Sequence, residues 1–111
     1  MTSRADQIAR NEALYRDVNE RVRDVRAAIP ASPELVEFLC ECGDRNCAET
    51  IPVTPEEYEG ARGDPKRFLL LPGHQAEDVE TVVAAVEGRF VIVEKHDEEA
   101  TIARKRDPRR L

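Results

Sequence analysis

The sequence has no tryptophan, only two tyrosines and three phenylalanines, and charged side chains at 36% of its 111 positions. With so few large apolar side chains, one domain of this length has a small hydrophobic core that a bound metal would help to stabilise. No apolar run approaches the roughly 18 residues that a membrane span needs, and residues 1–6 lack the apolar stretch of a secretory signal. We therefore expect a single cytoplasmic domain that does not enter a membrane.

Catalytic signatures are missing as well. The chain contains no Gly-rich phosphate loop, no Gly-x-Ser-x-Gly elbow and no His-Glu-x-x-His motif. Its clustered carboxylates, such as Glu56 with Glu57 and Glu98 with Glu99, are adjacent in sequence and are typical of solvated faces. These absences favour a non-catalytic protein, and we assign no catalytic residue, although they leave the question of enzymatic activity open.

Positive charge is scarce in the middle of the chain. The net charge is −6, and residues 30–99 carry seventeen acidic but only six basic side chains. Such a body repels a phosphate backbone, which disfavours nucleic acid as a partner. Residues 100–111 are the exception, with five basic residues and one acidic residue. We expect them to form a basic flexible tail, and a zinc-dependent nucleic-acid-binding regulator led by this tail is kept as a further alternative.

Residues 1–29 contain neither glycine nor proline and are predicted to form one long amphipathic helix that Pro30 ends. Asn11 fills the remaining core slot of a heptad seam, whose other members are Ile8, Tyr15, Val18, Val22, Val25 and Ile29. At about 1.5 Å per residue the helix is about 40 Å long, more than a small domain covers. The seam therefore predicts either a coiled coil with a protein partner or a second copy of the chain, or packing along the chain's own β-rich body.

Beyond Pro30 the pattern changes to short apolar segments. Residues 35–42 and 67–71 are typical of strands. Between them, Thr54 and Pro55 mark the start of a short helix, because threonine caps a helix well and proline suits its first position. That helix is predicted to end near Gly63.

The segment 79–87 is ambiguous. Its valines fit a helical face, but their β-branched side chains favour a hairpin with residues 90–94. Residues 34–99 are accordingly predicted to form a zinc-binding, β-rich domain. The predicted fold class is α+β, with a long N-terminal helix followed by a small, mostly antiparallel β-domain that has one short helix and is stapled by a Cys/His metal site.

The clearest chemistry lies in the cysteines. Cys40, Cys42 and Cys47 fall within eight residues, and the chain has no others. In a reducing compartment such a cluster favours metal ligands or redox thiols over disulfides. A strand places Cys40 and Cys42 on one face, and a turn after Cys42 brings Cys47 back beside them. Together with His74, which follows a Pro-Gly turn, they form the Cys₃His ligand set of a tetrahedral structural Zn²⁺ site.

The fourth ligand has a substitute, His96, which ranks second because it lies among charged residues. Four protein ligands leave no open position for a water molecule, so the predicted site is structural. If His74 were not a ligand, the open position would return, and Glu41 or Asp44 could serve as a nearby base.

In its Cys40-x-Cys42 start and its Gly73-His74 end, the chain also resembles the small CDGSH-type [2Fe-2S] proteins. The cluster of that family is held by three thiolates and one histidine. In that family the third cysteine sits shortly before the histidine, whereas here twenty-six residues separate Cys47 from His74. The resemblance implies a [2Fe-2S] cluster and a redox role as an alternative.

Six groups of short motifs lie between about residues 8 and 95. They are Arg10-Asn11-Glu12-Ala13-Leu14, Val18-Asn19-Glu20-Arg21-Val22, Phe38-Leu39-Cys40-Glu41-Cys42, Glu57-Tyr58-Glu59, Arg67-Phe68 with Pro72-Gly73-His74, and Val93-Glu94-Lys95. In these motifs the chain resembles a group of uncharacterised small proteins found mainly in actinobacterial-type genomes. The resemblance implies one coherent bacterial domain and transfers no activity.

These observations predict a small, non-catalytic zinc-binding adaptor or regulatory protein that acts through protein–protein interaction. A protein partner, or a second copy in a homodimer, would bind along residues 1–29. The alternative from a different class is a small thiol-redox or [2Fe-2S] protein.

Overall fold

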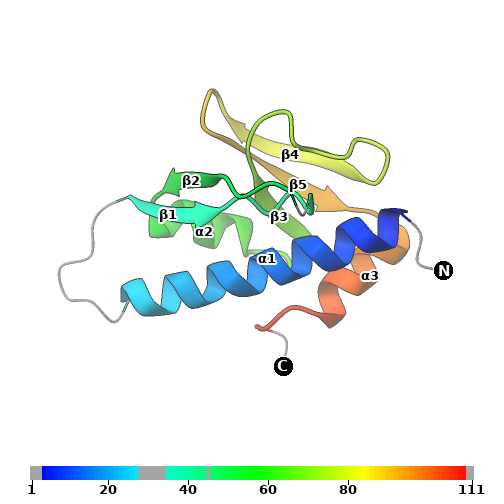
Figure 1. The fold of residues 1–111 in the computed structure, drawn as a ribbon, viewed down its shortest axis with the longest axis horizontal. Coiled ribbons are helices and arrows are strands. Elements are labelled where there is room, and N and C mark those ends of the chain that lie inside the picture. The colour runs from blue at the N-terminus through cyan, green and yellow to red at the C-terminus, as the bar shows by residue number, and fades with distance from the viewer. Residues whose placement is uncertain (1–3, 28–34, 45, 110–111) are drawn as a thin grey trace.

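The computed structural model describes residues 4–27, 35–44 and 46–109. They form one long helix, two short helices and two small antiparallel sheets (Figure 1), which confirms the α+β fold class predicted from the sequence. The elements are α1 (Arg4–Ala27), β1 (Val36–Leu39), β2 (Thr50–Val53), α2 (Pro55–Ala61), β3 (Arg67–Leu70), β4 (Glu80–Val86), β5 (Phe90–Lys95) and α3 (Asp97–Lys105).

The two sheets are joined at the end of β1. β1 and β2 form an antiparallel pair in which Val36 lies opposite Val53. The second sheet has the strand order β3-β5-β4, and both of its pairs are antiparallel. Just beyond β1, the Glu41 N–H donates to the Leu69 carbonyl of β3 across 2.8 Å. This bond places the segment that holds the cysteines against β3.

Helix α2 begins as the sequence predicts. The Glu57 N–H donates to Thr54 Oγ1, and the Thr54 N–H donates in return to Glu57 Oε1. This reciprocal pair is a capping box, and Pro55 suits the first helical position because it has no N–H to satisfy. The helix ends at Ala61, close to the predicted boundary at Gly63.

The ambiguous segment 79–87 is a strand, so the hairpin prediction is confirmed. β4 pairs with β5 through a turn at Gly88, whose φ of 75° lies in the left-handed region that glycine tolerates. The Arg89 N–H closes this turn on the Val86 carbonyl across 3.0 Å.

The described residues 100–109 do not form the flexible tail that their basic composition predicts. Residues 100–105 belong to α3, which buries Ala103 completely. Beyond the helix, the Arg109 guanidinium forms an ion pair with Glu20 of α1. The prediction is wrong for the described residues 100–109, because a buried helix face and a specific ion pair hold this segment and net composition reveals neither.

The hydrophobic core is small, as the composition predicts, and draws side chains from both sheets, α2 and α3. Phe38 and Tyr58 stack with their ring centroids 4.2 Å apart. The Arg16 guanidinium lies over the Phe68 ring, 4.6 Å from its centroid. Further side chains with 0% exposure are Ile51, Val53, Leu69, Leu70 and Val93.

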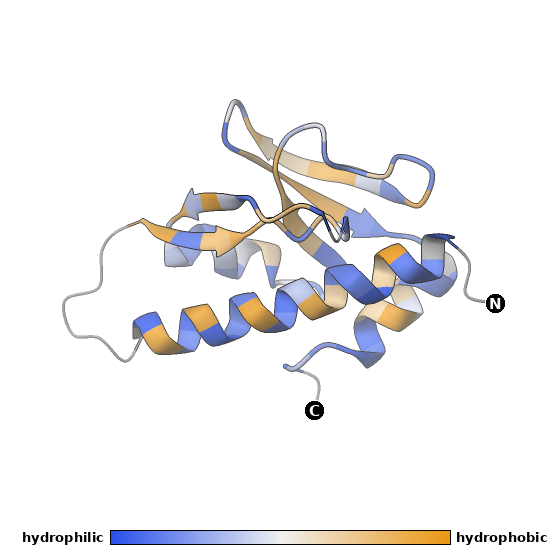
Figure 2. Cartoon of the chain, in the orientation of Figure 1, coloured by the Kyte–Doolittle hydropathy of each residue, from blue (hydrophilic) through white to orange (hydrophobic). Residues whose placement is uncertain are grey.

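Helix α1 packs on the rest of the protein through its polar face. Glu12, Arg16 and Asn19 are 0% exposed, and spacings of four and three residues place them on one side of the helix. Leu14 and Val18, on the opposite side, are 57% and 43% exposed. Figure 2 shows hydrophobic bands that recur along α1 between hydrophilic ones. The helix therefore packs along its own body mainly through these polar residues, and from the apolar seam Val22 packs partly against the core.

The buried charges on α1 have partners far along the chain. Lys95 Nζ lies 2.8 Å from a Glu12 oxygen and 2.9 Å from a Glu80 oxygen, and all three side chains are fully buried. Arg16 donates to the carbonyl of Ala103 across 2.7 Å. Because leaving such a charge buried without its partner costs about 3–5 kcal/mol, these contacts decide which face of α1 turns inward.

No helix within residues 4–27, 35–44 and 46–109 has both the length and the hydropathy that crossing a bilayer requires.

Candidate metal centre

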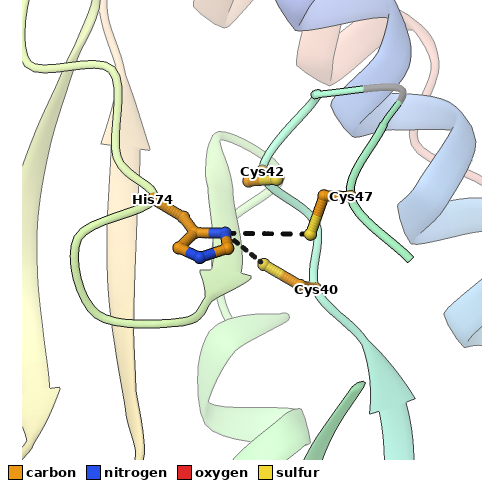
Figure 3. Close-up of side chains that lie close together, drawn as sticks. All are labelled: Cys40, Cys42, Cys47 and His74. Atoms are coloured by element: carbon orange, nitrogen blue, oxygen red, sulfur yellow. Dashed lines mark hydrogen bonds between the residues drawn. The ribbon is translucent and has the colours of Figure 1, made fainter. Parts of the chain in front are cut away.

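The structure brings the four predicted ligands together from two parts of the chain (Figure 3). One ligand atom from each of Cys40, Cys42, Cys47 and His74 lies within 4.8 Å of all the others. His74 Nδ1 is 3.7 Å from Cys40 Sγ and 3.7 Å from Cys47 Sγ. The juxtaposition expected from the sequence is therefore present.

The fold separates the two histidines. His96 lies at the junction of β5 and α3, where its Nε2 is 2.6 Å from Thr81 Oγ1 of β4, and it is not part of the cysteine cluster. His74, the histidine ranked first from the sequence, is the one that reaches the sulfur atoms.

Local backbone features position each cysteine. Cys40 directly follows β1, and Cys42 is followed by Gly43, whose φ of 80° turns the chain. The Cys47 N–H then donates to the Asp44 carbonyl across 2.9 Å, which closes the turn and returns Cys47 to the site.

Gly43 is also the point where α1 approaches the cysteines. A Cβ at this position would lie 2.7 Å from the Ile8 carbonyl oxygen, so no larger residue fits without movement. Asn11 Nδ2 donates to the Gly43 carbonyl across 2.9 Å, and the Tyr15 hydroxyl donates to the Asp44 carbonyl across 3.2 Å. Helix α1 therefore holds the cysteine turn from one side, and Asn11, predicted as a coiled-coil core residue, is engaged here.

His74 is presented by the turn that follows β3. Its N–H donates to the Leu71 carbonyl across 3.1 Å, and its ring faces the sulfur atoms (Figure 3). On the far side of the ring, Nε2 lies 3.5 Å from Glu49 Oε2. A carboxylate in this place favours a proton on Nε2 and leaves Nδ1 free to bind a metal. Sequence reasoning missed Glu49, and its position two residues after Cys47 is the only signal that could have suggested it.

The spacing of these atoms suits a tetrahedral metal ion. Bond lengths of about 2.3 Å to sulfur and about 2.0 Å to nitrogen put the ligand atoms of such a site about 3.5–3.8 Å apart. The distances of 3.7 Å from His74 Nδ1 to the sulfur atoms of Cys40 and Cys47 fall in this range. The three cysteines form no disulfide. The cluster can therefore hold a metal ion, with three thiolates and one imidazole as ligands.

Hydrogen bonds and burial give the three thiols different pKa values. The Leu71 N–H donates to Cys40 Sγ across 3.3 Å. A hydrogen bond from Cys40, against the opposing effect of burial and with help from the Asp44 backbone N–H, lowers the pKa of Cys42 to about 5. The hydrogen bond to Cys42, together with burial, raises the pKa of Cys40, and burial raises the pKa of Cys47. A divalent cation that displaced the two remaining protons would convert all three to thiolates.

Glu41, which lies between two of the cysteines, belongs to the packing between α1 and β3. The Leu69 N–H donates to its Oε1 across 2.9 Å, and Asn19 Nδ2 donates to its Oε2 across 2.7 Å. Burial raises the pKa of Glu41 to about 7 against the opposing effect of these bonds. Asp44, the other candidate base, accepts a hydrogen bond from the Asn46 N–H across 2.8 Å. Both carboxylates thus have structural partners.

Comparisons with protein-family models, curated proteins and solved structures gave no match. The resemblance to the actinobacterial-type group stays a prediction based on the sequence motifs.

Proposed function

We propose that this chain is a small, non-catalytic zinc-binding protein that acts through protein–protein interaction. The observation that supports the metal most strongly is the closed set of four ligand atoms, three Sγ and His74 Nδ1, within 4.8 Å of one another. Zn²⁺ prefers this mixture of thiolate and imidazole ligands in tetrahedral geometry. Because four protein atoms complete the coordination sphere, no position remains for a substrate, and we assign the ion a structural role.

A metal in this place would join the turn that follows β1 to the turn that follows β3. These turns come from the two different sheets. Binding to a preformed Cys₃His set contributes directly to folding free energy, since the unfolded chain has no such site. We also place the protein in the cytoplasm, because a reducing compartment keeps three such thiols available for a metal.

The interaction surface that we propose is a groove between α1 and β1, here named the α1 groove. It has a volume of about 880 Å³, and Leu14, Val18, Val22 and Val25 form its apolar lining. Leu14 and Val25 are 57% and 63% exposed. A helix that turns its polar residues inward and its apolar residues outward gains free energy when another protein covers the apolar side.

Elemental analysis of untagged protein, purified without added metal, tests the metal assignment. We expect colourless protein with one zinc ion per chain. A matched pair of histidine variants identifies the ligand: His74→Ala should lose the zinc, whereas His96→Ala should retain it. Protein with visible absorbance and stoichiometric iron would instead establish the redox alternative, and protein free of any transition metal would contradict the zinc assignment.

Matched valine variants test the interaction surface. Val18 and Val83 are 43% and 41% exposed, the first on α1 and the second on β4. Val18→Asp should abolish association with a protein partner, while Val83→Asp should leave it intact, and zinc content should stay the same in both variants. Equal association of the two variants would exclude the α1 groove as the binding surface.

A further inference from the structure

We propose that the α1 groove binds a second copy of this chain, with the two α1 helices antiparallel. This inference rests on the proposed function, which makes the groove a docking surface, and it names the partner. It draws on the charges that flank the apolar lining and on their order along the helix.

The acidic and basic residues that line the α1 groove are equal in number. The chain carries a net charge of −6, so two copies repel each other over most of their surfaces. The charged residues that line the groove are Asp17, Arg21, Arg26 and Glu37, two acidic and two basic. The groove is therefore neutral as a unit, and two copies can approach there without this repulsion.

The order of these charges along α1 favours an antiparallel pair of helices over a parallel one. Asp17 precedes Arg21 by four residues, which is about one helical turn. In a parallel pair each residue would lie beside its own copy, so that Asp17 would face Asp17 and Arg21 would face Arg21. In an antiparallel pair that crosses at the level of residues 19 and 20, Asp17 of one copy lies near Arg21 of the other. Opposite charges then meet, as they do in specific helix pairs.

The same crossing also matches the apolar side chains. Leu14 and Val25 are equally far from the crossing level, so Leu14 of one copy would meet Val25 of the other, and Val18 would lie beside Val22 of the other. The stripe from Leu14 to Val25 is about 16 Å long. An interface of this length is small, which predicts a weak dimer whose population depends on concentration.

The other exposed apolar strip of the described structure, on β4, is less suited to pairing two copies. Val82, Val83 and Val86 are 38–41% exposed on this edge strand. However, the register of β4 against β5 shifts between Val82 and Ala84. A bulge of this kind interrupts the ladder and twists an edge strand, which is a common protection against edge-to-edge pairing.

Sedimentation velocity of the zinc-loaded full chain over a concentration series tests the proposal. We expect a monomer–dimer equilibrium that Val18→Asp weakens at least tenfold and that Val83→Asp leaves unchanged. Val25→Asp provides a second variant at an exposed position, and circular dichroism with zinc analysis verifies that each variant is folded. A wild-type chain that is monomeric at every concentration would overturn the proposal, as would a dimer that only Val83→Asp disrupts.

A photo-crosslinking amino acid in place of Leu14 tests the orientation, with labelled and unlabelled chains mixed so that crosslinks between copies are recognised by mass. The antiparallel arrangement predicts crosslinks to residues 22–26 of the other copy, whereas crosslinks to residues 11–16 would contradict it. The wild type could instead be monomeric, bind zinc and bind a different protein, with Val18→Asp abolishing that binding. This result would refute the dimer and leave the proposed function standing. Absence of zinc would refute the metal assignment without bearing on the dimer.

Discussion

Asn19 of α1 and Glu41 of the cysteine segment share a buried hydrogen bond of 2.7 Å, although 22 positions separate them in the sequence. Asn19 also donates to the Leu39 carbonyl and accepts from the Leu39 N–H, each across 2.7 Å. One amide side chain thus satisfies the backbone of β1 and a carboxylate between two candidate metal ligands. Because successive side chains of an extended segment point to opposite faces, α1 holds one face of this segment while the sulfur atoms lie on the other.

Asn19→Ala should destabilise the protein by about 2–4 kcal/mol, because it leaves both a buried backbone pair and one oxygen of Glu41 without partners. Urea unfolding of the zinc-loaded protein measures this change. Gln7→Ala, an exposed position on the same helix, serves as the control and should change the stability little. An Asn19→Ala variant as stable as the control would show that water replaces the amide without cost.

Glycine variants test the close approach of α1 to the cysteine turn. Gly43→Ala should destabilise strongly, because φ is 80° and the new Cβ would lie 2.7 Å from the Ile8 carbonyl. Gly60→Ala should have the opposite sign, since nothing lies within 4 Å of its Cβ and alanine is favoured in a helix by about 0.5–1 kcal/mol. Thermal unfolding compares the two, and a Gly43→Ala protein that melts at the wild-type temperature would contradict the clash.

Glu49→Gln tests the carboxylate behind His74. It should weaken zinc binding about tenfold, the low end for such partners, because the 3.5 Å contact is long and Glu49 is 64% exposed on its side chain. Competition with a chelator of known affinity measures the change. Glu56→Gln, an exposed carboxylate at the start of α2, is the matched control. Equal affinities in the two variants would remove Glu49 from the site.

Because Glu20 forms ion pairs with Arg62 and Arg109, the protein should lose stability in acid. Burial raises the pKa of Glu20, but hydrogen bonds from Arg109 and Arg62 outweigh burial and hold the pKa below its usual 4.5. A carboxyl whose folded pKa is depressed stabilises the protein above its unfolded pKa, and this stability is lost as the pH falls through the folded pKa. The wild type should therefore exceed Glu20→Gln in stability at neutral pH, and the gap should close as the pH falls below about 4.5.

Denaturant unfolding of the metal-loaded proteins over a pH series measures that gap. Loss of metal in acid affects the wild type and Glu20→Gln alike, so the difference between them isolates the carboxyl. A gap that stayed constant, or widened, with falling pH would contradict the ion pairs of Glu20.

The parts that the sequence predicts are those that depend on neighbouring residues. The absence of glycine and proline before Pro30 predicts α1, and the Thr54 cap predicts α2, because both signals act within one turn of helix. The cysteine cluster is predictable for a similar reason, since three of the four candidate ligands fall within eight residues and share one chemistry. His74 is distant from them, and its place after a tight turn was the clue that distinguished it from His96.

The parts that the sequence does not predict depend on contacts between distant positions. The apolar seam did not reveal the most buried face of α1, because that face carries Glu12 and Arg16, which are satisfied by Lys95 and by the carbonyl of Ala103. The basic C-terminal segment looked like a free tail for the same reason. Its Arg109 finds Glu20, 89 positions away, and no local pattern carries that information.

The sequence by itself determined α1, α2, the main strands and the four side chains able to bind a metal, because backbone sterics, capping and ligand chemistry operate over a few residues. Only the tertiary structure decided that α1 turns Glu12 and Arg16 inward and leaves Val18 and Val25 exposed. It also decided that a carboxylate stands behind His74. These outcomes depend on buried charges, which are stable only where the fold supplies a partner of opposite charge or a free carbonyl. Such partners come from remote parts of the chain, and the complete fold is what brings them together.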